Sequence, residues 1–216
     1  MLTEADKRAL DARIAVLEAR TGVQVVAAVV PRADAYPELA WTAFALGASL
    51  AGLVVVVLDI VRPAWMSGYV ALSHVLPVLG AGIVAAILVA CVPRLAHLLL
   101  GHARAAGETR QFAQALFLER DLGRTKARTA VLLVVARFER RVELVADHGH
   151  DGRIAADEWR TVVDAATAGL ARGDGAAALL AALDRLEALL ASHGFAASGG
   201  TPADDLPNAP LEVSGP

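Results

Sequence analysis

Residues 39–58 read LAWTAFALGASLAGLVVVVL and contain no formally charged side chain. A helix needs about 20 apolar residues to cross a hydrocarbon core about 30 Å thick, so this stretch predicts a first membrane span at residues 39–58. The stretch from Pro63 to Pro93 also lacks Asp, Glu, Lys and Arg, and it predicts a second span at residues 69–92. Together the two spans predict a transmembrane hairpin over residues 41–93.

Aromatic residues stand at the ends of the two predicted spans. Trp41 opens the first span, and Trp65 and Tyr69 precede or open the second. Because indole and phenol rings prefer the headgroup level, we expect these three residues at the membrane interface and the lipid bilayer as a partner. His74 and Pro77 lie near the start of the second span. An ionisable group there suggests a proton or ion role, although the span is long enough to leave His74 in the interface.

Arginines predict the orientation of the hairpin. The flanks of the hairpin carry six of them near its ends, against Arg62 alone in the connecting loop: Arg13, Arg20, Arg32, Arg94, Arg104 and Arg110. The positive-inside rule therefore predicts a multi-pass protein of the cell (inner) membrane with both termini in the cytoplasm. The first 38 residues contain several charges and no apolar core, so we do not expect a cleavable signal peptide.

Composition excludes some function classes. Hydrophobic residues make up 56% of the chain and charged residues 20%, whereas soluble domains usually carry about 45–50% and 25%. A net charge of −3 provides no basic field for nucleic acid, which we do not expect as a partner. The single cysteine, Cys91, excludes an intramolecular disulfide and a Cys-rich zinc module.

The residues on either side of the hairpin predict one water-soluble domain. Leu10, Ile14 and Leu17 repeat at helical spacing and predict a helix over residues 4–20, with Thr3 and Asp6 at its capped start. The valine-rich run VQVVAAVV at residues 23–30 predicts a buried strand. We expect residues 1–40 and 94–195 to meet in one core.

The second flank continues this alternation of helices and strands. Residues 94–122 have helical composition, weakened at Gly101 and Gly107. Residues 131–136 and 142–146 predict an antiparallel hairpin, and two amphipathic helices follow it. Residues 196–216 are small, polar and rich in proline and glycine, which predicts a disordered tail. The predicted fold class is α/β, a small mixed sheet with helices on both faces, interrupted by the hairpin.

Several segments distributed along the chain resemble the TPM domain family, and in particular its bacterial membrane-protein branch. They are EARTGV at 18–23, FLER at 117–120, VLL at 131–133, ERRVELVAD at 139–147, DEW at 157–159, LASHGF at 190–195 and DLP at 205–207. The resemblance implies a TPM-like α/β/α sandwich with a transmembrane hairpin inserted after the first strand. It also implies an association with calcium and the acid phosphatase activity proposed for chloroplast members.

One acidic loop could hold a metal ion. Residues 147–158, DHGHDGRIAADE, resemble a twelve-residue EF-hand loop with Asp147, Asp151 and Glu158 at positions 1, 5 and 12. These three residues are our candidate ligands for calcium or another divalent cation. Gly149 and Ala155 supply no side-chain oxygen at positions 3 and 9, and a strand precedes the loop instead of a helix. The alternative is an ordinary strand-to-helix loop, with Asp157 and Glu158 favouring the helix N-terminus through the helix dipole.

Histidines and arginines near this loop allow two interpretations each. His148 and His150 lie on one side of an extended chain, which would suit a zinc pair, but solvated loop histidines are far commoner. The arginines at positions 137, 140 and 141 cluster around the hairpin turn with Glu139. They would suit an anionic headgroup or phosphate, or else form a solvated turn.

The sequence predicts a function class without assigning catalytic residues. Motifs of the Walker A, GxGxxG, HExxH, CxxC and GxSxG types are absent from the sequence. Our leading hypothesis is a membrane-anchored domain that serves as a binding, assembly or quality-control accessory for other membrane proteins. The alternative is a divalent-cation-dependent phosphohydrolase that uses the loop 147–158. Two spans are too few to enclose a transport pore or channel unless many chains assemble.

Overall fold

The computed structural model describes residues 2–61, 68–125, 128–171, 174–197 and 211–212. The chain divides into two compact units. Met1–Asp34 and Ala103–Pro216 form the α/β unit, and Ala35–His102 form the hairpin unit. The sequence places these boundaries at residues 40/41 and 93/94. In the structure they lie at 34/35 and 102/103. Helix α2 begins at Pro37, before the first predicted boundary, and the short helix α4 (Pro93–Leu99) packs on the two long helices of the hairpin unit after the second.

Helix α1 (Glu4–Thr21) begins where the sequence predicts and ends one residue later than predicted. The Thr3 hydroxyl accepts a hydrogen bond from the Asp6 backbone N–H at 3.1 Å. The Asp6 carboxylate in turn accepts from the Thr3 N–H at 2.8 Å, which completes a capping box. At the other end Gly22 takes a left-handed conformation (φ 69°), where a residue with a Cβ would be strained.

The α/β unit is built on a four-stranded mixed sheet in the order β3-β2-β1-β4. Strands β1 (Val25–Val30) and β2 (Val131–Ala136) are parallel, although the hairpin unit separates them in the sequence. Strand β3 (Arg141–Ala146) returns antiparallel to β2 through the turn at residues 137–140. This arrangement confirms the predicted α/β fold class.

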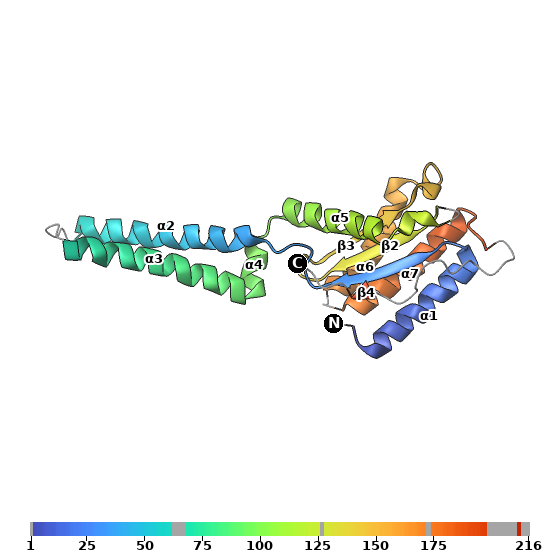
Figure 1. The fold of residues 1–216 in the computed structure, drawn as a ribbon, viewed down its shortest axis with the longest axis horizontal. Helices are drawn as coiled ribbons and strands as arrows, with labels where there is room; N and C mark the ends of the chain where they lie inside the picture. Colours follow the sequence, from blue (N-terminus) through green and yellow to red (C-terminus); the bar gives the residue numbers. More distant parts are fainter. Residues whose placement is uncertain (1, 62–67, 126–127, 172–173, 198–210, 213–216) are drawn as a thin grey trace. The chain divides into compact units, whose positions relative to one another are not determined.

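Helices cover both faces of the sheet. Alternate residues of a strand point to opposite sides, so each strand contributes side chains to both layers. Val25, Ala27 and Val29 of β1 enter the larger core, to which α1, α6 (Ala156–Ala171) and α7 (Gly175–Ser192) contribute. Val26, Ala28 and Val30 enter a smaller core beneath α5 (His102–Glu119). Figure 1 shows α5 on one side of the sheet and α1 and α7 on the other. The burial of β1 on both faces explains its almost uniformly apolar sequence.

The C-terminal tail differs from expectation at two residues. Leu211–Glu212 form the short strand β4, which pairs in parallel with Ala28 and Val29 of β1. Disorder is therefore the wrong prediction for these two residues, because they satisfy backbone groups on the otherwise open edge of β1. The remainder of the predicted tail lies outside the described residues, apart from Ala196 and Ala197.

The hairpin unit consists of two long apolar helices and α4. Helix α2 (Pro37–Val61) extends beyond the predicted span 39–58 at both ends. Helix α3 (Gly68–Cys91) begins one residue before the predicted span 69–92, ends one residue before its end, and continues through Pro77. Both are long and apolar enough to span a membrane, and few side chains in their most apolar segments are buried. A Cβ on Gly47 would lie 2.8 Å from the Ala81 carbonyl oxygen, so a glycine at this position permits close helix packing.

The predicted helix over residues 94–122 is divided in the structure. Pro93 is the first residue of α4, where its missing N–H costs nothing, and it follows the end of α3 at Cys91. The chain bends at Leu100 and Gly101 before α5 begins at His102, which agrees with the expected weakness at Gly101. A 3-10 turn, η1 (Leu122–Arg124), then follows α5.

Candidate functional site

The acidic loop joins β3 to α6 and starts at a buried carboxylate. Asp147 is only 5% exposed, and its Oδ1 accepts a hydrogen bond from the His148 N–H at 2.7 Å. This bond caps η2, a 3-10 turn at His148–His150. The second oxygen, Oδ2, is buried and has no hydrogen-bond partner among the described residues. Asp147 therefore serves the fold through one oxygen and has a second oxygen available for another group.

The other two predicted ligands have partners of their own. Asp151 is exposed, and its Oδ2 lies 3.0 Å from Nδ1 of His148. Glu158 lies in the first turn of α6 and is bonded to groups on two other segments. Among the described residues, no group of three or more His, Cys, Asp or Glu side chains is placed to hold a metal ion together. The divalent-cation site remains a prediction.

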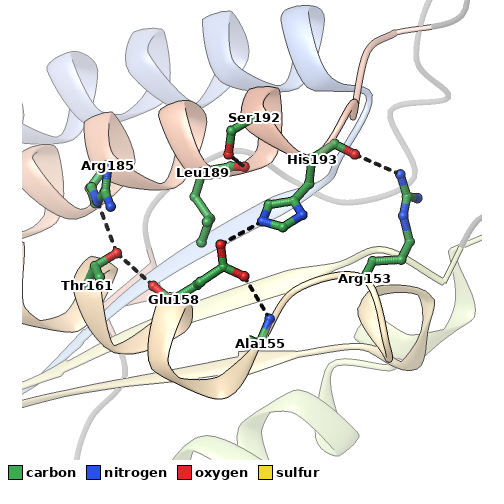
Figure 2. Close-up of polar contacts among 8 residues, drawn as sticks. All are labelled: Arg153, Ala155, Glu158, Thr161, Arg185, Leu189, Ser192 and His193. Atoms are coloured by element: carbon green, nitrogen blue, oxygen red, sulfur yellow. Dashed lines mark hydrogen bonds and ion pairs between the residues drawn. The ribbon is translucent and has the colours of Figure 1, made fainter.

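Glu158 forms a hydrogen-bonded pair with a histidine that the sequence analysis did not select. Its Oε1 lies 2.9 Å from Nε2 of His193, at the end of α7, and its Oε2 accepts from the Ala155 backbone N–H at 2.9 Å (Figure 2). The bond from Ala155, followed by that from His193, lowers the pKa of the Glu158 carboxyl below its usual value. Glu158 thus caps α6, as the alternative interpretation predicts, and also links α6 to α7.

Further polar contacts brace the same two helices (Figure 2). The Arg153 guanidinium donates to the His193 carbonyl at 3.2 Å and lies 3.7 Å from the centre of the Phe195 ring. Arg185 donates to the Thr161 hydroxyl, which itself donates to the Glu158 carbonyl. The nearby Ser192 hydroxyl donates to a backbone carbonyl of its own helix. The described contacts make this cluster a polar clamp between α6 and α7, with no hydroxyl hydrogen-bonded to His193.

His150 is a buried residue, which corrects the interpretation that His148 and His150 are solvated on one side of an extended loop. The η2 turn separates them, so that His148 is exposed and His150 is only 2% exposed. His150 Nε2 lies 2.9 Å from the Thr129 carbonyl, which can only accept, so Nε2 carries the proton. The ring packs edge-on against Trp159 and tilted against Phe195.

Burial gives His150 a predictable effect on stability. Desolvation lowers the pKa of its imidazole below the usual value. The unfolded chain therefore binds a proton more readily than the folded chain once the pH falls below about 6.5, and stability is lost as the pH decreases through that window. We expect the urea midpoint of the wild type to decrease when the pH is lowered from 7.5 to 5.5. His150→Phe should flatten this dependence, whereas His148→Gln should retain it. An unchanged slope in His150→Phe would contradict the assignment.

The arginine cluster at the hairpin turn surrounds a buried acid. Glu139 is 4% exposed, and its Oε1 accepts from the Ala33 backbone N–H at 2.9 Å. Arg137 and Arg140 are exposed, and Arg140 has a positive φ of 52°. The acid therefore points into the fold while two guanidinium groups face solvent. This geometry is compatible with either predicted use of the arginines.

The candidate interface residues lie on the hairpin helices. Trp41 on α2 is 72% exposed and Tyr69 on α3 is 88% exposed. Such exposure of large aromatic rings suits contact with a lipid headgroup layer. Trp65 lies outside the described residues.

Comparison with known proteins identifies the family. The fold is a mixed α/β domain interrupted by an apolar helical hairpin, and the TPM domain model matches residues 80–189. The chain belongs to the TPM domain family. It is also similar to the BA42 protein from the psychrophilic bacterium Bizionia argentinensis, with a TM-score of 0.57 and 14% identity over 99% of this chain and 96% of that chain. No curated protein matches.

Proposed function

We propose that this TPM domain is anchored in the cell membrane by α2 and α3 and acts as a binding, assembly or quality-control accessory for other membrane proteins. The observation that carries the proposal is the pair of long helices with outward-facing apolar side chains. On α2, the side chains of Leu53, Val57 and Ile60 are 60%, 50% and 74% exposed. Monomeric soluble proteins rarely expose apolar surfaces of this extent, which favours a lipid environment.

The contacts of the acidic loop favour the accessory role over hydrolysis. Glu158 binds the Ala155 N–H and His193, and Asp151 lies beside His148. Asp147 also caps a turn with one of its oxygens. Each of the three candidate ligands thus already contacts another group of the protein. The charge distribution of the sequence supports a cytoplasmic location for both flanks of the hairpin.

Topology reporters test the anchoring and its orientation. We expect the full chain to remain in the membrane pellet after alkaline carbonate extraction. A reporter that is active only outside the cytoplasm should be silent when it is fused after Pro216 and active when it is inserted near Pro63. A soluble chain would contradict the anchor, and the reverse reporter pattern would contradict the orientation.

A partner test addresses the accessory role. Chemical crosslinking in intact cells, followed by purification in detergent, should join the α/β unit to defined membrane proteins. The matched control is the hairpin unit expressed alone with the same tag, which should lose those crosslinks while it remains in the membrane. Equal crosslinks from both chains would locate partner binding in the hairpin and contradict a binding role for the α/β unit.

Metal addition separates the accessory from the phosphohydrolase alternative. We expect millimolar calcium to change the melting temperature by no more than about 2 °C, because an ion bound only to the folded state stabilises it by mass action and few ligands converge here. Asp151→Ala with Glu158→Ala should leave any residual phosphate release unchanged. Robust metal-dependent release that disappears in this double variant would favour the phosphohydrolase.

A further inference from the structure

The hairpin unit contains a groove between α2 and α3 that the proposed accessory function does not use. Its volume is about 620 Å³, within the range of about 300–1,000 Å³ typical of ligand pockets. The inner end lies at Gly47 and Ala81, where a Cβ on Gly47 would lie 2.8 Å from the Ala81 carbonyl oxygen. Aliphatic side chains such as Leu50 and Val54 line its middle, and Asp59 and His74 lie at its outer end.

The outer end is the polar end of the groove. His74 Nε2 lies 3.3 Å from Asp59 Oδ1, and the Asp59 side chain remains 47% exposed. Among the described residues that line the groove, Asp59 is the one formally acidic residue, and none is a lysine or an arginine. The exposed Asp59 carboxylate complements a cationic group and repels an anion.

The length of the groove matches one leaflet of a bilayer. Gly47 and Asp59 are twelve residues apart on one helix, which corresponds to about 18 Å at a rise of 1.5 Å per residue. Half of a hydrocarbon core of about 30 Å measures about 15 Å. Asp59 is two residues from the end of α2, so in a spanning hairpin it lies near headgroup level. An acyl chain would then extend from the charged end to the contact at Gly47.

We propose that this groove binds an ethanolamine phospholipid, with the headgroup ammonium at Asp59 and one acyl chain along α2 and α3. The inference rests on the proposed membrane anchoring. The ammonium supplies a positive charge, and its N–H groups donate hydrogen bonds that a carboxylate can accept. A choline headgroup has the charge without the donors, and a glycerol headgroup has neither.

Native mass spectrometry of the full chain in detergent tests this assignment. Phosphatidylethanolamine, phosphatidylcholine and phosphatidylglycerol with matched acyl chains are added in equal amounts. We expect phosphatidylethanolamine to be retained about fivefold more than phosphatidylglycerol, the preference that one exposed ion pair supports, with phosphatidylcholine between them. Asp59→Asn should abolish the preference. Glu38→Gln, an equivalent charge removal at the opposite end of α2, should preserve it.

A second pair of variants tests the apolar part of the groove. Ala51→Leu places a side chain in the groove and should reduce the retention of all three lipids. Gly52→Leu is the matched control, because no atom lies within 4 Å of a Cβ there and Gly52 does not line the groove. Equal retention in the two variants would overturn the proposal. A change in oligomer mass in Ala51→Leu would also overturn it, because the groove would then hold a second copy of the chain.

The outcomes distinguish this inference from the proposed function. Carbonate extraction of the wild type and Asp59→Asn decides whether the hairpin is anchored. A chain that resists extraction but shows no headgroup preference would overturn the lipid site and leave the anchor intact. A chain that is extracted would overturn both.

Discussion

Deletion of residues 2–34 is expected to abolish the cooperative folding of the α/β unit. The starting protein for this test is a chain in which residues 35–102 are replaced by a flexible glycine–serine linker, which should fold because both cores belong to the α/β unit. The deletion removes α1, whose Leu10, Ile14 and Leu17 are fully buried, together with β1, which is buried on both faces. Truncation of one large core side chain costs about 2–5 kcal/mol, so the combined loss exceeds the typical stability of a domain.

Circular dichroism and urea denaturation provide the measurement. The linker chain should give one sigmoidal transition, and the deleted chain should give none and aggregate through the edge of β2 that β1 covers. The intact linker chain is the control for removal of the hairpin. A monomeric deleted chain with a cooperative transition would show that β1 is dispensable and that the two flanks do not form one folding unit.

Gly169→Ala is expected to destabilise the α/β unit by about 3 kcal/mol. A Cβ at this position of α6 would lie 2.6 Å from the backbone nitrogen of Ala178 on α7, a distance that forces one helix to move. Inserting atoms into a well-packed interface typically costs about 1–3 kcal/mol, and a backbone atom yields less readily than a side chain. The shift would also strain the contacts between Glu158 and His193 that join the same helices.

Gly107→Ala is the matched control for this substitution. Gly107 lies in α5 of the same unit, is exposed, and has no atom within 4 Å of its Cβ position. Alanine should therefore stabilise the protein by about 0.5–1 kcal/mol through helix propensity alone. Opposite shifts of the urea midpoint are the expected result. Destabilisation of similar size in both variants would show that close packing of α6 on α7 is not the cause.

Two ion-pair contacts join α1 to α7 through residues that could not be paired from the sequence. Arg13 on α1 donates to Asp184 on α7 at 2.6 Å, and Arg20 donates to Glu187 at 2.7 Å. The Arg20 hydrogen bond is the main cause that lowers the pKa of the Glu187 carboxyl. These pairs are separated by more than 160 positions. No local spacing relates them, because only the packing of α1 against α7 brings them together.

Local patterns in the sequence predicted most of the helices and strands of this protein and the family to which it belongs, although the helix predicted over residues 94–122 is divided and β4 was not predicted. Apolar runs of sufficient length predicted the two hairpin helices, and helical spacing with Thr3 and Asp6 predicted α1 and its cap. The continuous apolar sequence of β1 predicted a strand buried on both faces. These features depend on contacts between neighbouring residues and on hydrophobic periodicity, both of which are local properties of the chain.

The roles of the polar side chains became apparent from the packing of distant segments in the tertiary structure. It placed His150 in a buried aromatic setting, paired Glu158 with His193 across 35 positions, and added Leu211–Glu212 to the edge of β1. It also placed Asp59 and His74 together at one end of the groove. The burial and hydrogen bonding of a polar group depend on which distant segments pack around it. A carboxylate in an acidic loop and one in a helix cap therefore look alike until the fold is known.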